Sequence, residues 1–286
     1  MTGILLIAFG RRGYGLAAHN LALSLRAYAP DLNIVLYASD NLQGTFDPSL
    51  FTAIHRIEDS DYLHPTSGKI DPARAKCQAY AFGIRAGLDR FLFLDVDAIC
   101  LADIRPTLAA LKGCTVATYA MPMGQKSEAA WWAKPEVMRK HFDLSPDAVI
   151  CGVQSSWMYF ERGKVCDLMQ QLLSYYFAQG RPVGGMALEW SKAGMLPDEF
   201  VYQGVFARMG IVPTSPPLPR QMVFFGNNKA TETPDQVAER YNVLAIYGTK
   251  SLTLPKWLRM YDRCMAAIGS HWHGSDQIMK DKFANF

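Results

Sequence analysis

The sequence lacks the features that mark secreted, membrane-spanning or nucleic-acid-binding proteins. Its six cysteines include no C-x-x-C pair, and no uninterrupted apolar stretch approaches the length of a membrane span. The formal net charge is only +3, which provides no strongly basic face for nucleic acid. No basic leader with a cleavage site precedes the first predicted strand at Gly3. These absences favour a cytoplasmic protein with reduced thiols.

Internal repeats and low-complexity tracts are also missing, but the chain is long enough to bury a large core. Half of its 286 residues are hydrophobic, and this length suits a single α/β domain with a C-terminal elaboration. A proline-rich segment at residues 213–219 marks a change of character. We therefore predict a main domain over residues 1–225 and a C-terminal extension over residues 226–286.

The start of the chain has the pattern of a strand, a turn, a helix and a second strand. The strands are expected over residues 3–9 and 33–37, the helix over 16–28, and the turn at the glycines of 10–15. This order is typical of a mostly parallel, nucleotide-binding sheet. A nicotinamide cofactor is not favoured, because the glycine spacing does not match G-x-G-x-x-G.

Helices and strands continue to alternate downstream. Asp71 and Pro72 supply an N-cap and a first-turn proline for a helix that is expected to end near Gly87. Further strands are predicted over 115–120 and 156–160, and further helices over 165–178 and 199–209. The alternation predicts an α/β fold with helices flanking the sheet.

The most informative segment is residues 91–97, where four large apolar residues are followed by Asp95, Val96 and Asp97. The apolar run predicts a buried parallel strand, and ligand sites lie at the carboxyl ends of such strands. Two carboxylates there repel each other unless a cation lies between them, and a divalent cation carrying phosphates is the simplest candidate. A D-x-D triplet also occurs by chance in solvated turns. The prediction of a cation site therefore depends on the apolar strand that precedes the two carboxylates.

Together these features resemble glycosyltransferases of the GT-A fold, and most closely the glycogenin-like family 8. Besides the D-x-D strand, the resemblance rests on the interval between Tyr14 and Ser24-Leu25 and on Lys76 in the helix before that strand. It rests also on the C-terminal segment from His271 to Gly274. The resemblance implies a Rossmann-like, mixed and mostly parallel sheet, with nucleotide-sugar binding and catalysis in residues 1–225 and a metal site completed by residues 226–286.

The same resemblance implies a metal-dependent transfer of a sugar from a UDP-sugar to an acceptor hydroxyl, with retention of configuration. Mn²⁺ or Mg²⁺ is expected on Asp95, Asp97 and His271, with His273 as the alternative histidine. An imidazole can complete such a site of carboxylates and phosphate oxygens. Because the metal ligands are expected to face the surface, Asp97→Ala is expected to abolish donor turnover and leave the fold intact.

Further residues follow from the resemblance. Tyr14 is expected to stack on uracil, and Lys76, Lys280 or Lys282 to reach the diphosphate. Asp198 and Gln154 are expected near the reacting centre together with Lys76, although their segments match the family less closely. The complete expected donor-binding set is Ala8, Phe9, Tyr14, Lys76, Asp95, Val96, Gly274 and Lys280.

The acceptor stays open at this point, with a carbohydrate ahead of a modified nucleic-acid base. Tryptophans could stack on a sugar or a base, but are more often anchors of the core and loops. These tryptophans are Trp131, Trp132, Trp157 and Trp190. Two other functions remain: a nucleotidyltransferase that makes the sugar-nucleotide, faintly indicated by the turn at residues 10–13, and a non-catalytic protein that binds sugar-nucleotides.

Overall fold

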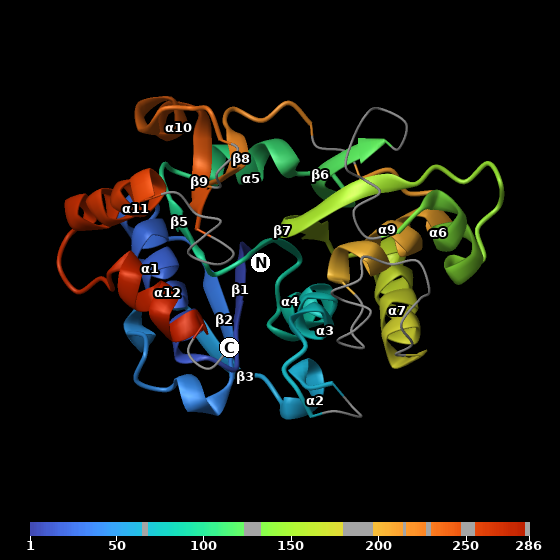
Figure 1. Cartoon of the computed structure of the whole chain (residues 1–286), viewed down its shortest axis with the longest axis horizontal. Coiled ribbons are helices and arrows are strands. Elements are labelled where there is room, and N and C mark those ends of the chain that lie inside the picture. Colours follow the sequence, from blue (N-terminus) through green and yellow to red (C-terminus); the bar gives the residue numbers. More distant parts are fainter. Residues whose placement is uncertain are drawn as a thin grey trace. The chain divides into compact units, whose positions relative to one another are not determined.

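A computed structural model describes residues 1–64, 68–122, 133–179, 197–213, 216–226, 230–246 and 255–283. In these ranges the main sheet has the strand order β3-β2-β1-β4-β7-β6, and a second sheet has the order β5-β9-β8 (Figure 1). Most neighbours with a described register are parallel, whereas β6 runs antiparallel to β7. The predicted class, an α/β fold with a mixed, mostly parallel sheet flanked by helices, is confirmed.

The chain divides into two compact units, and each unit combines separate stretches of sequence. The first unit contains Met1, Glu58–Arg90 and Gly113–Pro216. The second unit contains Thr2–Ile57, Phe91–Lys112 and Pro217–Phe286. The boundary that we expect between residues 225 and 226 stays a prediction.

The N-terminal part of the second unit follows the predicted order of elements. Strands β1 (Thr2–Ala8), β2 (Ile34–Ala38) and β3 (Ala53–Arg56) pair in parallel. Helix α1 (Arg12–Tyr28) begins four residues earlier than expected, so the glycines at 13 and 15 lie in its first turn. Two short 3-10 helices, η1 (Asp40–Leu42) and η2 (Pro48–Leu50), follow β2.

The rest of the second unit forms around the three-stranded sheet. Its strands are β4 (Arg90–Leu94), β5 (Ala98–Cys100), β8 (Gln221–Phe225) and β9 (Tyr241–Ala245), and β4 joins the main sheet. Its helices are α5 (Arg105–Leu111), α10 (Pro234–Arg240), α11 (Pro255–Ile268) and α12 (Ser275–Phe283). Helix α1 is tied to β5 because Ser24 Oγ accepts a hydrogen bond of 2.8 Å from the Cys100 amide.

The first unit contains a helix break that the sequence pattern does not predict. Its helices are α2 (Asp59–Tyr62), α3 (Pro72–Lys76), α4 (Ala79–Arg85), α6 (Pro135–Phe142), α7 (Lys164–Gln179) and α9 (Asp198–Met209). Its strands are β6 (Val116–Pro122) and β7 (Cys151–Glu161). The single helix expected from Pro72 to about Gly87 is wrong, because Cys77 and Gln78 have ψ near zero and interrupt it.

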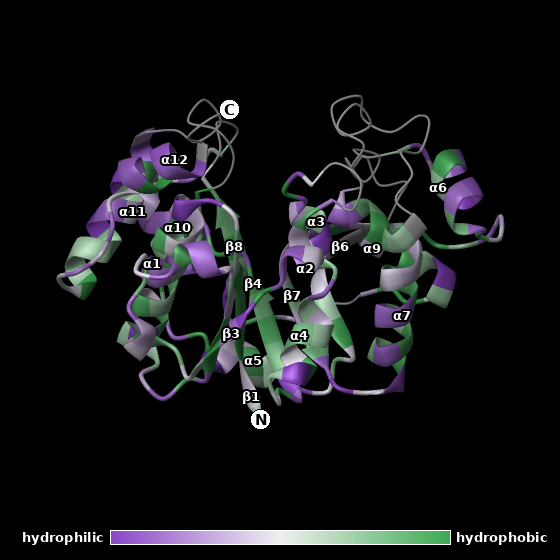
Figure 2. Cartoon of the chain, turned by 90° about the horizontal axis from the view of Figure 1, so that it is seen from below, coloured by the Kyte–Doolittle hydropathy of each residue, from purple (hydrophilic) through white to green (hydrophobic). Residues whose placement is uncertain are grey.

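Burial explains why the apolar runs form strands. The last four residues of β4 are buried, and Figure 2 colours this strand as hydrophobic.

None of the described helices combines the length and the apolarity that crossing a membrane requires. All six cysteines are free thiols, and the cytoplasmic location stays a prediction.

Candidate functional site

The two carboxylates of the D-x-D segment lie in the short connection from β4 to β5. Strand β4 ends at Leu94 and β5 begins at Ala98, so Asp95 and Asp97 follow the carboxyl end of β4 as predicted. The carbonyl oxygen of Asp97 accepts a hydrogen bond of 2.9 Å from the Ile246 amide. Val96 is buried. This hydrogen bond and the buried side chain of Val96 hold the backbone of the connection in place at Asp97.

Asp97 holds a cation that belongs to the protein itself. The ammonium of Lys282 donates a hydrogen bond of 2.7 Å to Asp97 Oδ2. The side chain of Lys282 is 2% exposed and that of Asp97 14% exposed. Burial lowers the pKa of Lys282, but the negative charge of Asp97, with Tyr14 and Asp95, outweighs it and raises the pKa above its usual value. Lys282 is therefore a buried, charged ammonium at neutral pH.

The turn between β1 and α1 fixes the position of Lys282. Arg11 Nη1 donates a hydrogen bond of 2.6 Å to the Lys282 carbonyl. A Cβ at Gly13 would lie 2.4 Å from the Lys282 amide nitrogen, so only glycine admits this approach of α12. The Lys282 ammonium lies 5.4 Å from the centre of the Tyr14 ring. The sequence predicts only that this turn connects a strand and a helix. In the structure it also fixes the backbone position of Lys282.

Helix α1 also holds the loop that carries the two predicted histidine ligands. His19 Nε2 donates to the His271 carbonyl at 2.7 Å, and His19 Nδ1 accepts from the Asp47 amide at 3.1 Å. His271 has a positive φ of 75° and an exposed side chain. Burial is the main cause of the lowered pKa of His273, and the positive charge of Arg12 adds to it. His273 is therefore neutral at pH 7, as a metal ligand must be.

The predicted metal site can be compared with this geometry. Across the described ranges, no three His, Cys, Asp or Glu side chains gather closely enough to hold a metal ion. The carboxylate of Asp97 does suit a cation, because it already binds the ammonium of Lys282. The oxygen and nitrogen donors of Asp95, Asp97 and His271 suit Mn²⁺ or Mg²⁺ by type, but a site on all three needs these side chains closer together than they lie here. The metal site stays a prediction.

The residues expected near the reacting centre lie in the first unit. Lys76 Nζ lies 3.8 Å from Asp198 Oδ2, and their side chains are 23% and 14% exposed. Asp198 Oδ2 is buried and accepts no hydrogen bond within the described part of the chain. The Ser155 amide, adjacent to Gln154, donates to Glu199 Oε1 at 3.3 Å. Strand β7 and the start of α9 are therefore neighbours, and both carry predicted residues.

The remaining predicted residues have different environments. Tyr14 stacks on Phe9 with 6.2 Å between ring centroids, and its partly exposed ring keeps the uracil-stacking role a prediction. Ala8 is fully buried, so only its main chain is available to a ligand. Lys280 is exposed, whereas Lys282 reaches the D-x-D segment, although the sequence left the choice between these lysines open.

The tryptophans and the cavity of the first unit give little support for an acceptor site. Trp157 is 3% exposed and belongs to the core, and Trp131, Trp132 and Trp190 lie outside the described residues.

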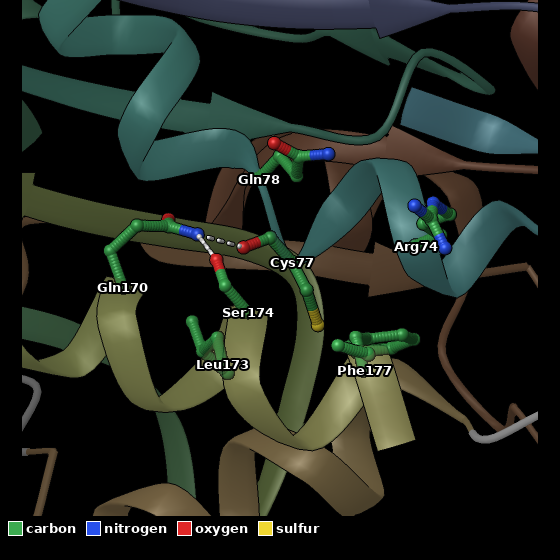
Figure 3. Close-up of a pocket in the computed structure, with 8 residues that line it drawn as sticks. Arg74, Cys77, Gln78, Gln170, Leu173, Ser174 and Phe177 are labelled. Carbon is green, nitrogen blue, oxygen red and sulfur yellow. Dashed lines mark hydrogen bonds between the residues drawn. The ribbon is translucent and has the colours of Figure 1, made fainter. Parts of the chain in front are cut away.

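A cavity of about 110 Å³ lies between α3, α4 and α7, where Gln170 donates to the Cys77 carbonyl and to Ser174 (Figure 3). Small-molecule sites usually measure about 300–1,000 Å³, so this cavity is too small for a nucleotide-sugar.

Comparison with known proteins identifies the fold. No protein-family model and no curated protein matches the chain. Among solved structures, the bifunctional glycosyltransferase WbbM has a TM-score of 0.56 at 14% identity, over 98% of this chain and 51% of WbbM. The galactosyltransferase LgtC, in complex with donor and acceptor sugar analogues, has a TM-score of 0.54 at 12% identity, over 97% of this chain and 100% of LgtC.

An active-site mutant of LgtC gives a TM-score of 0.51 at 12% identity, over 98% of this chain and 100% of the mutant. The chain spans about half the length of WbbM, which is covered to 51%, but the whole length of LgtC. At these identities the likeness establishes the GT-A glycosyltransferase fold and leaves activity to be argued from the residues.

Proposed function

We propose that this protein transfers a sugar from a nucleotide-sugar, a UDP-sugar above all, to an acceptor hydroxyl. The observation that carries the proposal is the position of Asp95 and Asp97 at the carboxyl end of β4. In an open α/β sheet this edge binds ligands, and carboxylates there serve to hold a cation that accompanies phosphate. LgtC, which has the same fold, was solved with donor and acceptor sugar analogues, and this supports the same class of reaction here.

The charge of the leaving group is the main chemical problem of this reaction. When the anomeric bond breaks, negative charge develops on the diphosphate, so fixed positive charge beside it stabilises the transition state. The buried ammonium of Lys282 is one source of such charge. Mn²⁺ or Mg²⁺, held by Asp95, Asp97 and His271, would act as a Lewis acid on the phosphate oxygens.

The first unit supplies groups that suit the donor sugar. Asp198 Oδ2 is a buried acceptor whose hydrogen-bonding capacity is unused within the described part of the chain, and a sugar hydroxyl is a suitable donor for it. The ammonium of Lys76 lies 3.8 Å from this carboxylate and forms an ion pair with it. We propose that Asp198 and Gln154 orient the donor sugar and stabilise the positive charge that develops on its anomeric carbon. We further propose that the transfer retains the anomeric configuration. A carbohydrate is favoured over a nucleic acid as the acceptor.

A panel of nucleotide-sugars tests the proposal in two measurements. Thermal shift with Mn²⁺ present identifies the donor, because a ligand that binds the folded state raises the melting temperature. Free UDP is then measured with the best donor, and slow donor hydrolysis or transfer is expected. Release of pyrophosphate from UTP and a sugar phosphate would instead identify a nucleotidyltransferase. Stabilisation without any UDP release would identify a binding protein, and either result contradicts the proposal.

A further inference from the structure

The cavity between α3, α4 and α7 in the first unit has a wall of mixed chemistry. Figure 3 shows Arg74 and Gln170 on opposite sides of it, with Cys77 between them. We propose that this cavity binds one edge of a neutral sugar residue of a glycan. The inference goes beyond the proposed reaction and does not depend on it, because it uses none of the residues that are assigned to donor or metal.

Gln170 of α7 fixes the wall of the cavity at the break between α3 and α4. Its Nε2 donates to the Cys77 carbonyl at 3.1 Å and to Ser174 Oγ at 3.3 Å. A carbonyl oxygen only accepts, so these bonds determine the orientation of the amide. The two helical segments are thereby joined around the cavity, which is formed before a ligand binds, as small-molecule sites usually are.

Three other polar side chains of the wall keep hydrogen-bonding capacity for a ligand. Within the described part of the chain, Arg74 uses only Nε, which donates to a main-chain carbonyl at 2.6 Å. Gln78 Nε2 donates to Asp61 Oδ1 at 3.1 Å, so Gln78 Oε1 is left to accept. Ser174 Oγ accepts one hydrogen bond and retains its own proton for donation. The wall therefore offers donors and an acceptor together, and hydroxyl groups, which both donate and accept, match it.

The charges around the cavity disfavour an ionic ligand. Arg74 belongs to the wall itself and repels a cation. Asp61 lies directly behind Gln78, and Glu58 and Asp59 precede it in the chain, so these acidic residues repel an anion. A neutral ligand meets neither repulsion.

The size and the apolar part of the wall favour a sugar among neutral ligands. Leu173 and Phe177 line the cavity beside the polar groups, and an aromatic ring offers an apolar surface to the C–H face of a sugar. A cavity of about 150 Å³ holds one benzene molecule, so the 110 Å³ found here suits one edge of a sugar ring. The rest of the sugar would lie outside, where Ser174 and Ala178 are exposed.

Titration of the isotope-labelled full chain with methyl α-D-glucopyranoside or methyl β-D-galactopyranoside, followed by NMR, tests the inference. We expect saturable shifts of the side-chain amide signals of Gln170 and Gln78, with a Kd of about 1–10 mM for a ligand of this size. Acetate and methylammonium, which are small ions of opposite charge, are expected to give no saturable shift of these signals.

A variant that blocks the cavity locates the binding. Ser174→Phe places a large side chain at the exposed side of the wall, and we expect it to abolish saturable binding of both sugars. Gln171→Phe is the matched control, because Gln171 is also exposed on α7 and lies outside the described wall of the cavity. Its affinity for the sugars should stay within about twofold of the wild type, since surface substitutions usually have small effects.

A second pair of variants tests the guanidinium. Arg74→Met removes the Nη donors, and we expect the affinity for the sugars to fall about tenfold, as for the loss of a hydrogen bond from a charged group. Arg162→Met loses the same charge elsewhere in the first unit, where Arg162 is 60% exposed and lies 3.5 Å from Asp89. Its affinity should be unchanged.

The outcomes leave the inference either supported or overturned. Saturable binding of acetate or methylammonium in place of the sugars would contradict a neutral ligand. Shifts that stay linear for both sugars, or equal affinities in Ser174→Phe and Gln171→Phe, would overturn the site. Neither result concerns UDP release, so the proposed function is tested separately.

Discussion

Asn20 in α1 holds both main-chain polar groups of His273. Its Nδ2 donates to the His273 carbonyl at 2.6 Å, and its Oδ1 accepts from the His273 amide at 2.9 Å. Asn20 is fully buried, so both bonds are shielded from water. Through them α1 fixes the loop before α12, the helix that carries Lys282. The N-terminal helix thus determines the position of C-terminal residues assigned to the donor site.

Asn20→Ala leaves the two polar groups of His273 without these partners. Each unsatisfied buried group costs about 1–3 kcal/mol, so we expect the free energy of unfolding to fall by at least about 2 kcal/mol. Urea denaturation measures the change. Asn33→Ala is the control, because Asn33 makes one hydrogen bond of 2.9 Å, to the Thr2 carbonyl, and is only partly buried. Equal losses in the two variants would contradict the bracing role of Asn20.

Asp97→Ala is expected to destabilise the protein as well as to inactivate it. The sequence prediction of an intact fold does not take the buried partner into account, because the variant leaves Lys282 charged and 2% exposed. Loss of one partner of a buried pair costs about 3–5 kcal/mol. The double variant Asp97→Leu with Lys282→Met removes both charges, and we expect it to recover most of that stability in urea denaturation. A double variant as unstable as Asp97→Ala would show that the pair does not set the stability.

Gly204→Ala is expected to destabilise the first unit. A Cβ at this position in α9 would lie 2.2 Å from the ring of Phe142, which is fully buried and packed on Phe200. Overpacking of this kind costs about 1–3 kcal/mol. Gly163→Ala is the matched control, because nothing lies within 4 Å of its added Cβ. Thermal melts of both variants test this, and equal melting temperatures would contradict the close packing of α9 on α6.

Acid is expected to destabilise the first unit through His141. Burial among aromatic rings lowers the pKa of His141, whose ring lies 5.5 Å from Phe200 and 4.7 Å from Phe142. The folded state therefore favours the neutral ring, and this stability is lost as the pH falls below the unfolded pKa of about 6.5. Urea denaturation at pH 7 and pH 5 measures the loss. It should be smaller in His141→Phe, and an unchanged loss would contradict the assignment.

Local patterns predicted the parts of the site that lie within one segment. The apolar run before Asp95 and Asp97 identified β4, because a buried strand produces a run of neighbouring apolar residues. The N-cap at Asp71 identified the start of α3. The break at Cys77 was not predictable, since the apolar positions continue with helical spacing across it.

Contacts between distant segments could not be read from the same patterns. Lys282 contacts Asp97 although 185 positions of the chain separate them. Nothing in the sequence around Lys282 distinguishes it from the exposed Lys280, so the choice between the two lysines could not be made from the sequence. The resemblance to a known family named Lys76 and Asp198, which the structure places 3.8 Å apart. The second sheet was missed because β5 has only three residues and its partner β9 lies far along the chain.

Release of UDP from a UDP-sugar, measured in parallel for the wild type and Asp97→Asn, tests the central claim most directly. Asparagine keeps a hydrogen-bond acceptor for Lys282 and removes the negative charge that would hold a divalent cation. We predict measurable UDP release by the wild type and a loss of about 100-fold or more in the variant, as for other groups that stabilise transition-state charge. Equal rates in the two proteins, or no UDP release from any donor by the wild type, would contradict the account.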